Sequence, residues 1–277
     1  MFAQLLTLPF IILALLFLYL AWDVDSEYAP WMVPFIVIAV LLFILAPQIN
    51  WWWYRRRPPV LSPGLSDMLE RFNNFYQGLS EADKKRFCER VALFRMATDW
   101  TPMGFPEDTM PPDVELALAA QAVMLSFHKT EFLFPAFEKV IVYPFPFPSP
   151  EYQFAHASEL YVADGCLLFS AEQVLQAFVE PRRLYNVGLH EYARVFVLAY
   201  PNEQYPAFDG DDDWVKLEQA SGMSRAFVES VTGLAGADGL PVAIHHFFVF
   251  RESFKALFPK QATIFEQIFG AGTEAIT

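Results

Sequence analysis

Two long uncharged runs open the chain, and they limit its possible folds more than any other feature. The first run covers residues 2–22 and the second residues 31–54, and neither contains Lys, Arg, Asp or Glu. A helix rises about 1.5 Å per residue, so each run can cross roughly 30 Å of hydrocarbon. The sequence therefore predicts that residues 1–57 form a two-helix transmembrane hairpin, which contacts a lipid bilayer through residues 2–54.

Charged and aromatic residues beside the runs predict the orientation of this hairpin. Three Trp and a Tyr at residues 51–54 suit the headgroup layer, and three Arg follow at residues 55–57. By the positive-inside rule this end is cytoplasmic, so both termini and the rest of the chain are expected in the cytoplasm, with a bacterial inner membrane as the expected location. A cleaved signal peptide is disfavoured because no basic segment precedes the first run. A buried soluble hairpin is disfavoured because it gives the Trp and Arg cluster no role.

The charge balance excludes one class of partner. The chain carries 19 basic and 32 acidic side chains among 277 residues, a formal net charge of −13. Nucleic-acid binding rests on clustered Lys and Arg that neutralise phosphates, so no nucleic-acid partner is expected.

Only two cysteines, Cys88 and Cys166, are present, which excludes a disulfide framework and fits reduced thiols in the cytoplasm.

Beyond the prolines at 58, 59 and 63 the composition becomes amphipathic, and residues 58–277 are expected to form one cytoplasmic domain. Helical periodicity and capping residues alternate there with short runs typical of strands, which predicts an α+β fold that is mainly helical with a small β-sheet. Helices are expected from Ser66 to about Gln77, from Ser80 onward, and over 113–127, 182–199, 212–231 and 241–270, the last broken at Pro259. Strands are expected over 140–143, 160–162 and 167–169, the last two forming a hairpin.

One helical segment carries residues suited to metal chemistry. It reads His190, Glu191, Tyr192, Ala193, Arg194. In the pattern His-Glu-x-x-His, two imidazoles four residues apart bind one Zn²⁺ and the Glu polarises the metal-bound water. Here Arg194 stands at the second His position, and a guanidinium has no lone pair for a cation. Taken alone, the segment is a weak signal, and a solvent-facing helical turn is the better explanation.

Four blocks in the right order place this segment in a wider context. They are residues 79–87, residues 118–125 leading into 140–144, His190 with Glu191, and residues 247–248 with 254 and 257–259. In these blocks the chain resembles the Mlc titration factor A family of zinc-dependent peptidases over about 190 residues. The resemblance implies a zincin-like domain, and the hairpin lies outside it.

The resemblance also assigns roles to individual residues. His190 falls on the first zinc-binding His, Glu191 on the catalytic general base, and Asp238 on the third metal ligand, while Val231 falls on a Tyr that steadies the oxyanion. Arg194 is interpreted as a replacement for the metal, with its guanidinium within hydrogen-bonding range of Glu191 or Asp238. His245 and His246 are possible substitute ligands. Neighbours on a helix point about 100° apart, so only one of the two can face the site.

Catalytic zinc takes three protein ligands and a water, so this set predicts reduced or lost peptidase activity. The leading hypothesis is a membrane-anchored pseudoenzyme of the metallopeptidase type that binds a protein or peptide partner in its cleft. Zinc is possible by family resemblance, but its absence is the stronger expectation. The first alternative is an active zinc peptidase with an unusual ligand set, and the second is a structural protein of membrane assemblies.

Overall fold

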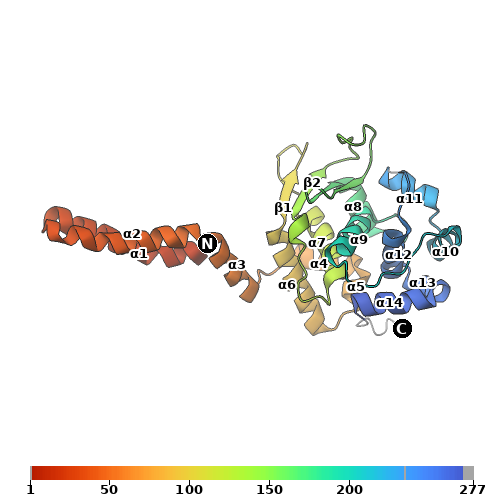
Figure 1. Cartoon of the computed structure of the whole chain (residues 1–277), viewed down its shortest axis with the longest axis horizontal. Helices are drawn as coiled ribbons and strands as arrows, with labels where there is room; N and C mark the ends of the chain where they lie inside the picture. The colour runs from red at the N-terminus through yellow and green to blue at the C-terminus, as the bar shows by residue number, and fades with distance from the viewer. Residues whose placement is uncertain (1, 234, 271–277) are drawn as a thin grey trace. The chain divides into compact units, whose positions relative to one another are not determined.

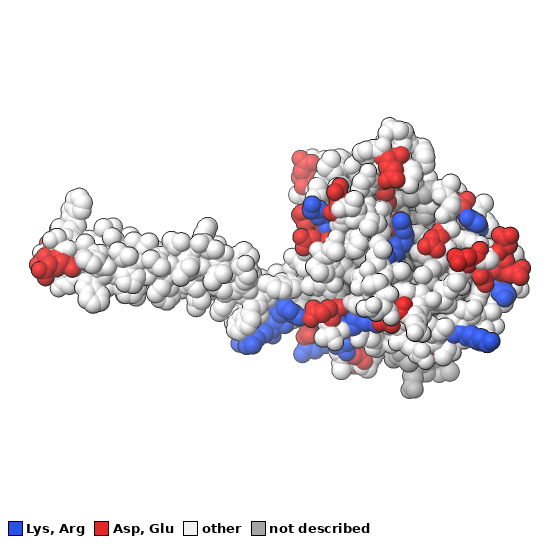
Figure 2. Space-filling view, in the orientation of Figure 1, with Lys and Arg blue, Asp and Glu red and all other residues white. Residues whose placement is uncertain are grey.

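The structure, a computed structural model, describes residues 2–233 and 235–270 and contains two compact units, Met1–Pro59 and Val60–Thr277. In the first unit α1 (Phe2–Asp23) lies beside α2 (Ala29–Ile44), joined by a short 3₁₀ turn over Ser26–Tyr28 (Figure 1). Phe17 and Phe35 stack between them with ring centroids 5.5 Å apart. The segments Phe2–Asp23 and Ser26–Ile44 are long and apolar enough to cross a membrane, and Figure 2 shows their surface free of charged residues except at the acidic turn.

The second uncharged run forms two helices instead of one. Helix α2 ends at Ile44, and α3 (Ala46–Arg56) begins after Leu45. Pro47 explains the break, because its ring clashes with the carbonyl four residues earlier and it has no N–H to donate. In each candidate span, none of the residues in the most apolar window is buried inside the protein. Apolar side chains therefore cover the outer surface of the hairpin, as a lipid-facing pair of helices requires.

Most of the second unit is helical. The Ala-rich helix α7 (Pro112–Ser126) is central to it, because every one of its residues from Leu116 to Ser126 is buried. Helices α6 and α9 pack against α7, and α12 packs against α9. The remaining bounds are α4 (Pro63–Phe72), α5 (Asn74–Gln77), α6 (Glu81–Ala97), a 3₁₀ turn over Pro135–Phe137, α8 (Ala171–Val179), α9 (Val187–Ala199), α10 (Asp211–Ser221), α11 (Arg225–Thr232), α12 (Gly239–Val249), α13 (Arg251–Leu257) and α14 (Pro259–Phe269).

A four-stranded sheet covers one side of these helices (Figure 1). Its order is β1-β2-β4-β3, formed by β1 (Asp99–Pro102), β2 (Lys139–Tyr143), β3 (Ser158–Tyr161) and β4 (Cys166–Ser170). The first three strands in this order are parallel, and β3 runs antiparallel to β4 at the edge. The predicted α+β class, the strand at 140–143 and the hairpin are confirmed.

Several predicted boundaries were wrong, and β1 and α8 were not predicted at all. The first helix begins at Pro63 after Ser62 and not at Ser66. The helix expected over 212–231 is interrupted at Gly222, whose φ of +75° ends α10 in the left-handed conformation that glycine adopts without strain. The segment 241–270 is divided at Phe250 as well as before Pro259.

Candidate active site

Helix α9 carries the residues of the candidate site. It begins after Asn186, whose Oδ1 accepts the backbone N–H of Leu189 at 3.0 Å and so caps the helix. Its first two turns are buried, with His190 6% and Glu191 1% exposed. The alternative of a solvent-facing turn is therefore wrong, and a carboxylate this deeply buried requires polar partners.

Both oxygens of Glu191 have partners. Ser158 on β3 donates from Oγ to Oε1 at 2.9 Å, and Arg194 donates from Nη1 to Oε2 at 2.8 Å. The Arg194 side chain is 34% exposed, so its cation reaches from the surface to a buried carboxylate. The predicted contact between Arg194 and Glu191 is present. Ser158 was missed because it lies 33 residues away and only the sheet brings it to α9.

The hydroxyl of Tyr185 contacts the imidazole of His190. The hydroxyl oxygen lies 2.6 Å from Nδ1 of His190, and the Tyr185 ring lies 4.4 Å from that of His245. Burial raises the pKa of Tyr185 well above its ordinary value, so the phenol remains neutral. Burial lowers the pKa of His190, against the opposing effect of Glu191, so the neutral imidazole is favoured. Tyr185 precedes the helix in sequence, but no sequence pattern indicated this role.

His245 and His246 form a hydrogen-bonded pair. The backbone N–H of Asn186 donates to Nε2 of His245 at 3.2 Å, so that nitrogen carries no proton. In the neutral ring Nδ1 then carries the proton and donates to Nδ1 of His246 at 3.1 Å. Burial lowers the pKa of His246 to about 3 and that of His245 well below its ordinary value. The lone pairs of both rings are therefore engaged within the protein, which argues against their proposed role as substitute metal ligands.

Asp238 lies at the start of α12. Its Oδ1 accepts the backbone N–H of Leu240 at 3.1 Å as a helix cap, and the residue is exposed. The negative charge of Asp238 acts to raise the pKa of His190 and so partly opposes the effect of burial. The two residues therefore interact electrostatically without a hydrogen bond. Val231 lies in the last turn of α11.

These residues do not provide the set of donor atoms that a catalytic zinc ion needs. Within the described residues no group of three His, Cys, Asp or Glu side chains could hold a metal ion. His190 and Asp238 offer two ligands, and Arg194 brings a permanent cation to the carboxylate of Glu191. A third ligand and a free carboxylate are both needed for the zinc chemistry of a peptidase, and this arrangement supplies neither.

A second buried polar pair lies next to Ser158 in the sequence. His156 contacts Oε2 of Glu159 through Nε2 at 3.1 Å, and both side chains are buried. Nδ1 of His156 lies 3.0 Å from the carbonyl of Phe154, so that nitrogen donates. A proton must then lie between Nε2 and the carboxylate, because two lone pairs would otherwise face each other. This pair fixes the segment that leads into β3, and sequence spacing gave no sign of it.

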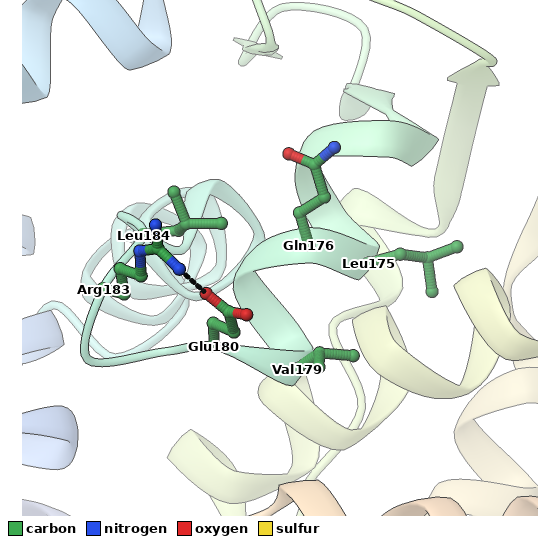
Figure 3. Close-up of a pocket in the computed structure, with 6 residues that line it drawn as sticks. All are labelled: Leu175, Gln176, Val179, Glu180, Arg183 and Leu184. Atoms are coloured by element: carbon green, nitrogen blue, oxygen red, sulfur yellow. Dashed lines mark hydrogen bonds and ion pairs between the residues drawn. The ribbon is translucent and has the colours of Figure 1, made fainter.

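A surface groove of about 510 Å³ lies apart from these residues (Figure 3). It follows the outer side of α8 and the loop after it, and an exposed ion pair between Glu180 and Arg183 borders it at 3.2 Å. Its lining contains none of the candidate site residues: Leu175, Gln176, Val179, Glu180, Arg183 and Leu184.

Comparison with known proteins supplies the family. No curated protein matches the chain. The sequence pattern of the glucose-regulated metallo-peptidases M90, which are zinc-dependent, matches residues 49–196. The matched range includes His190, Glu191 and Arg194 and ends before Asp238. Because it covers more than half of the chain, this protein belongs to the glucose-regulated metallo-peptidase family M90.

Proposed function

We propose that this protein is a membrane-anchored member of its family whose peptidase activity is reduced or lost, and that it acts by binding a protein or peptide partner. One observation carries the proposal: Arg194 forms an ion pair at 2.8 Å with Glu191, the residue that the family resemblance proposes as the general base.

The ion pair opposes peptidase chemistry in two ways. A guanidinium cannot coordinate a cation, so the second imidazole ligand has no substitute at this position. Both oxygens of the carboxylate also already accept a hydrogen bond, one from Ser158 and one from Arg194, which makes the carboxylate a weaker base toward a water molecule. Releasing Arg194 would leave a carboxylate that is 1% exposed without its cation, which is costly in a buried environment.

A peptide partner is supported by the surroundings of Glu191. Strand β3 lies at the edge of the sheet and reaches Glu191 through Ser158. The residues of β3 are themselves buried, with Ser158 0%, Glu159 2% and Leu160 8% exposed, so a peptide would contact the segment that precedes this strand. The segment before β3 also exposes two large apolar side chains, Phe145 at 66% and Phe154 at 51%. Exposed apolar side chains beside a sheet edge suit an extended peptide with apolar residues at alternate positions.

The hairpin supports membrane anchoring. Its two apolar helices fit the thickness of a bilayer, and Arg56 and Arg57 lie over the rings of Trp52 and Trp53 at 4.2 and 4.5 Å. Such pairs of aromatic rings and cations suit the headgroup layer. The orientation in this proposal places the second unit in the cytoplasm of a bacterial cell.

Metal content and hydrolysis test the loss of activity. The full chain, purified in detergent, should contain substoichiometric zinc by elemental analysis. Any hydrolysis of fluorescent casein should be unchanged in Glu191→Gln. Stoichiometric zinc that disappears in His190→Ala, together with hydrolysis that disappears in Glu191→Gln, would contradict the proposal and favour an active peptidase.

Peptide binding needs a separate measurement. Fluorescence anisotropy with a library of labelled extended peptides should find ligands that bind the full chain. Phe154→Ala should weaken them at least fivefold, whereas Val215→Ala, which removes a side chain 65% exposed on α10, should not. Equal effects of the two substitutions would remove β3 and its neighbours from the binding surface.

A further inference from the structure

A groove lies on the outer surface of the hairpin, between the start of α1 and α3. Its volume is about 500 Å³, and its lining consists of five apolar side chains and one amide: Phe2, Leu6, Leu45, Gln48, Ile49 and Trp52. Leu6, Leu45 and Trp52 are 42%, 46% and 49% exposed. The groove is therefore open on its outer side, where the acyl chains of a membrane would contact it.

Two contacts between α1 and α3 fix the walls of this groove. Oδ1 of Asn50 accepts the backbone N–H of Ala3 at 2.9 Å, and Ala3 is buried. The rings of Phe2 and Trp53 stack with their centroids 4.0 Å apart. Asn50 thus satisfies a backbone donor in the first turn of α1, where an unpaired N–H would be costly beside lipid. The fold of the hairpin itself forms the groove.

Two guanidinium groups lie at the end of α3, next to the groove. Arg56 lies over the ring of Trp52 at 4.2 Å, and Arg57 lies over the ring of Trp53 at 4.5 Å. Stacking uses the face of a guanidinium and leaves the N–H groups along its edge available. Within the described part of the chain, neither guanidinium forms a hydrogen bond or an ion pair. Each can therefore donate two N–H groups to one oxyanion.

The charges of the hairpin favour an anion at this end. Its three acidic residues, Asp23, Asp25 and Glu27, all lie at the opposite end, at the tip of the hairpin in Figure 2. The carboxyl end of α3 opposes an anion, but the amino end of α1 lies beside it and has the opposite effect. The two helix dipoles thus offset each other, and the guanidinium groups make the potential positive.

The order of groups along α3 matches the order of groups in a phospholipid. Side chains on a helix lean toward its amino end, and Arg56 reaches back over Trp52. Since Trp52 follows Gln48 by four residues, the guanidinium lies roughly 6 Å beyond Gln48 along the helix. A glycerophospholipid has its phosphate outermost, then its ester carbonyls, then its chains. The guanidinium therefore suits the phosphate, the amide of Gln48 suits an ester carbonyl, and Leu45 and Ile49 suit an acyl chain.

We propose that this groove is a binding site for an anionic glycerophospholipid such as phosphatidylglycerol. Arg56 and Arg57 bind its phosphate, and Gln48 donates to an ester carbonyl. A zwitterionic phospholipid binds less well, because its ammonium group adds a further positive charge beside the two guanidinium groups. The proposal rests on the membrane anchoring proposed above and is independent of the chemistry at Glu191.

Quenching of tryptophan fluorescence by brominated lipids tests the preference. The full chain is placed in nanodiscs of phosphatidylcholine that contain a minor fraction of phosphatidylglycerol or phosphatidylcholine with brominated acyl chains. We expect phosphatidylglycerol to bind beside Trp52 and Trp53 at least fivefold more tightly, since one cation near a membrane surface contributes about fivefold. Glycerol 3-phosphate, which has the anion but no acyl chains, should not reverse the quenching. Reversal would assign the cations to a soluble phosphate and overturn the lipid site.

Two substitutions test the assigned groups. Arg56→Gln changes an exposed side chain and should reduce the preference for phosphatidylglycerol about fivefold. The matched control Arg182→Gln removes the same charge from an exposed position in the second unit and should leave the preference unchanged. Ether-linked phosphatidylglycerol, which has no ester carbonyls, should bind the unmodified chain at least about twofold more weakly than the ester form. It should bind Gln48→Leu as well as the ester form does.

Nanodiscs of phosphatidylcholine alone separate this proposal from the membrane anchoring on which it rests. A full chain that does not enter such discs contradicts the anchoring and the lipid site together. A chain that enters them but is quenched equally by both brominated lipids overturns only the lipid site. Equal effects of Arg56→Gln and Arg182→Gln, or equal binding of the ether and ester lipids to the unmodified chain, overturn it as well.

Discussion

Arg194 donates to Glu191 across one turn of α9, with 2.8 Å between Nη1 and Oε2. The carboxylate is almost fully buried, whereas about a third of the cationic side chain remains exposed. Ser158 holds the other carboxylate oxygen at 2.9 Å. The charge of this buried carboxylate is thus balanced by the chain itself, through the guanidinium of Arg194 and the hydroxyl of Ser158.

Removing that cation should destabilise the fold. Arg194→Ala leaves the Glu191 carboxylate buried with only Ser158 as a partner, so we expect a loss of about 1–3 kcal/mol in the free energy of unfolding. Denaturant unfolding of the full chain in detergent measures it. Arg183→Ala is the matched control, because its ion pair with Glu180 is exposed and should contribute less than about 0.5 kcal/mol. Similar losses for both variants would show that the contact with Glu191 has no special weight.

Restoring an imidazole should restore metal binding. Arg194→His removes the cation and supplies the ligand that the pattern lacks, and Oδ2 of Asp238 is left for a metal because the helix cap uses Oδ1. We expect this variant to bind about one zinc per chain by elemental analysis. Adding Asp238→Asn should abolish the binding, whereas adding Asp209→Asn should not. Zinc that persists after Asp238→Asn would exclude Asp238 as the third ligand.

Acid should destabilise the protein through its buried histidines. Burial lowers the pKa of His245 and His246, so below about pH 6.5 the unfolded chain binds protons that the folded chain does not. The contribution of these histidines to the free energy of unfolding is therefore fully present above this pH and decreases as the pH falls. For His246 it decreases until the pH reaches its folded-state pKa of about 3. Each histidine changes the free energy of unfolding by up to about 1.4 kcal/mol per pH unit.

His246→Leu isolates one of these contributions. Between pH 6 and 5 the slope of the unfolding free energy against pH should decrease by up to about 1.4 kcal/mol per unit. Measurements at pH 8, where histidine is neutral in both states, give the constant offset due to packing. An unchanged slope would mean that His246 becomes protonated without unfolding.

The hairpin should place both termini in the cytoplasm. Arg55, Arg56 and Arg57 are the only cationic cluster next to either apolar run, and cytoplasmic flanks retain such clusters. A reporter fused after Thr277 that is active only in the cytoplasm should be active, and one that needs export should be silent. Replacing the three Arg by Gln should produce a mixed orientation. An active exported reporter on the unmodified chain would reverse the predicted topology.

Sequence alone predicted the features that depend on nearby residues. The spacing of His190, Glu191 and Arg194 places them on adjacent faces of one helix, because three or four residues make one turn. A helix was predicted from Ser80 onward, and the hydroxyl of Ser80 caps it by accepting the backbone N–H of Asp83. Helix breaks were less predictable, since the interruption at Gly222 depends on a backbone conformation and not on composition.

Only the tertiary structure decided how the candidate site is satisfied. Ser158 reaches Glu191 from a strand 33 residues away, and the backbone of Asn186 bonds to His245 from 59 residues away. Neither contact has a periodic signal in the sequence, because hydrogen-bond partners across a core are selected by packing and by the cost of burying unpaired polar groups. The sequence determined that a cation, Arg194, lies one helical turn after His190. The fold determined that this cation neutralises a carboxylate buried to 1% exposure, because only packing removes that carboxylate from water.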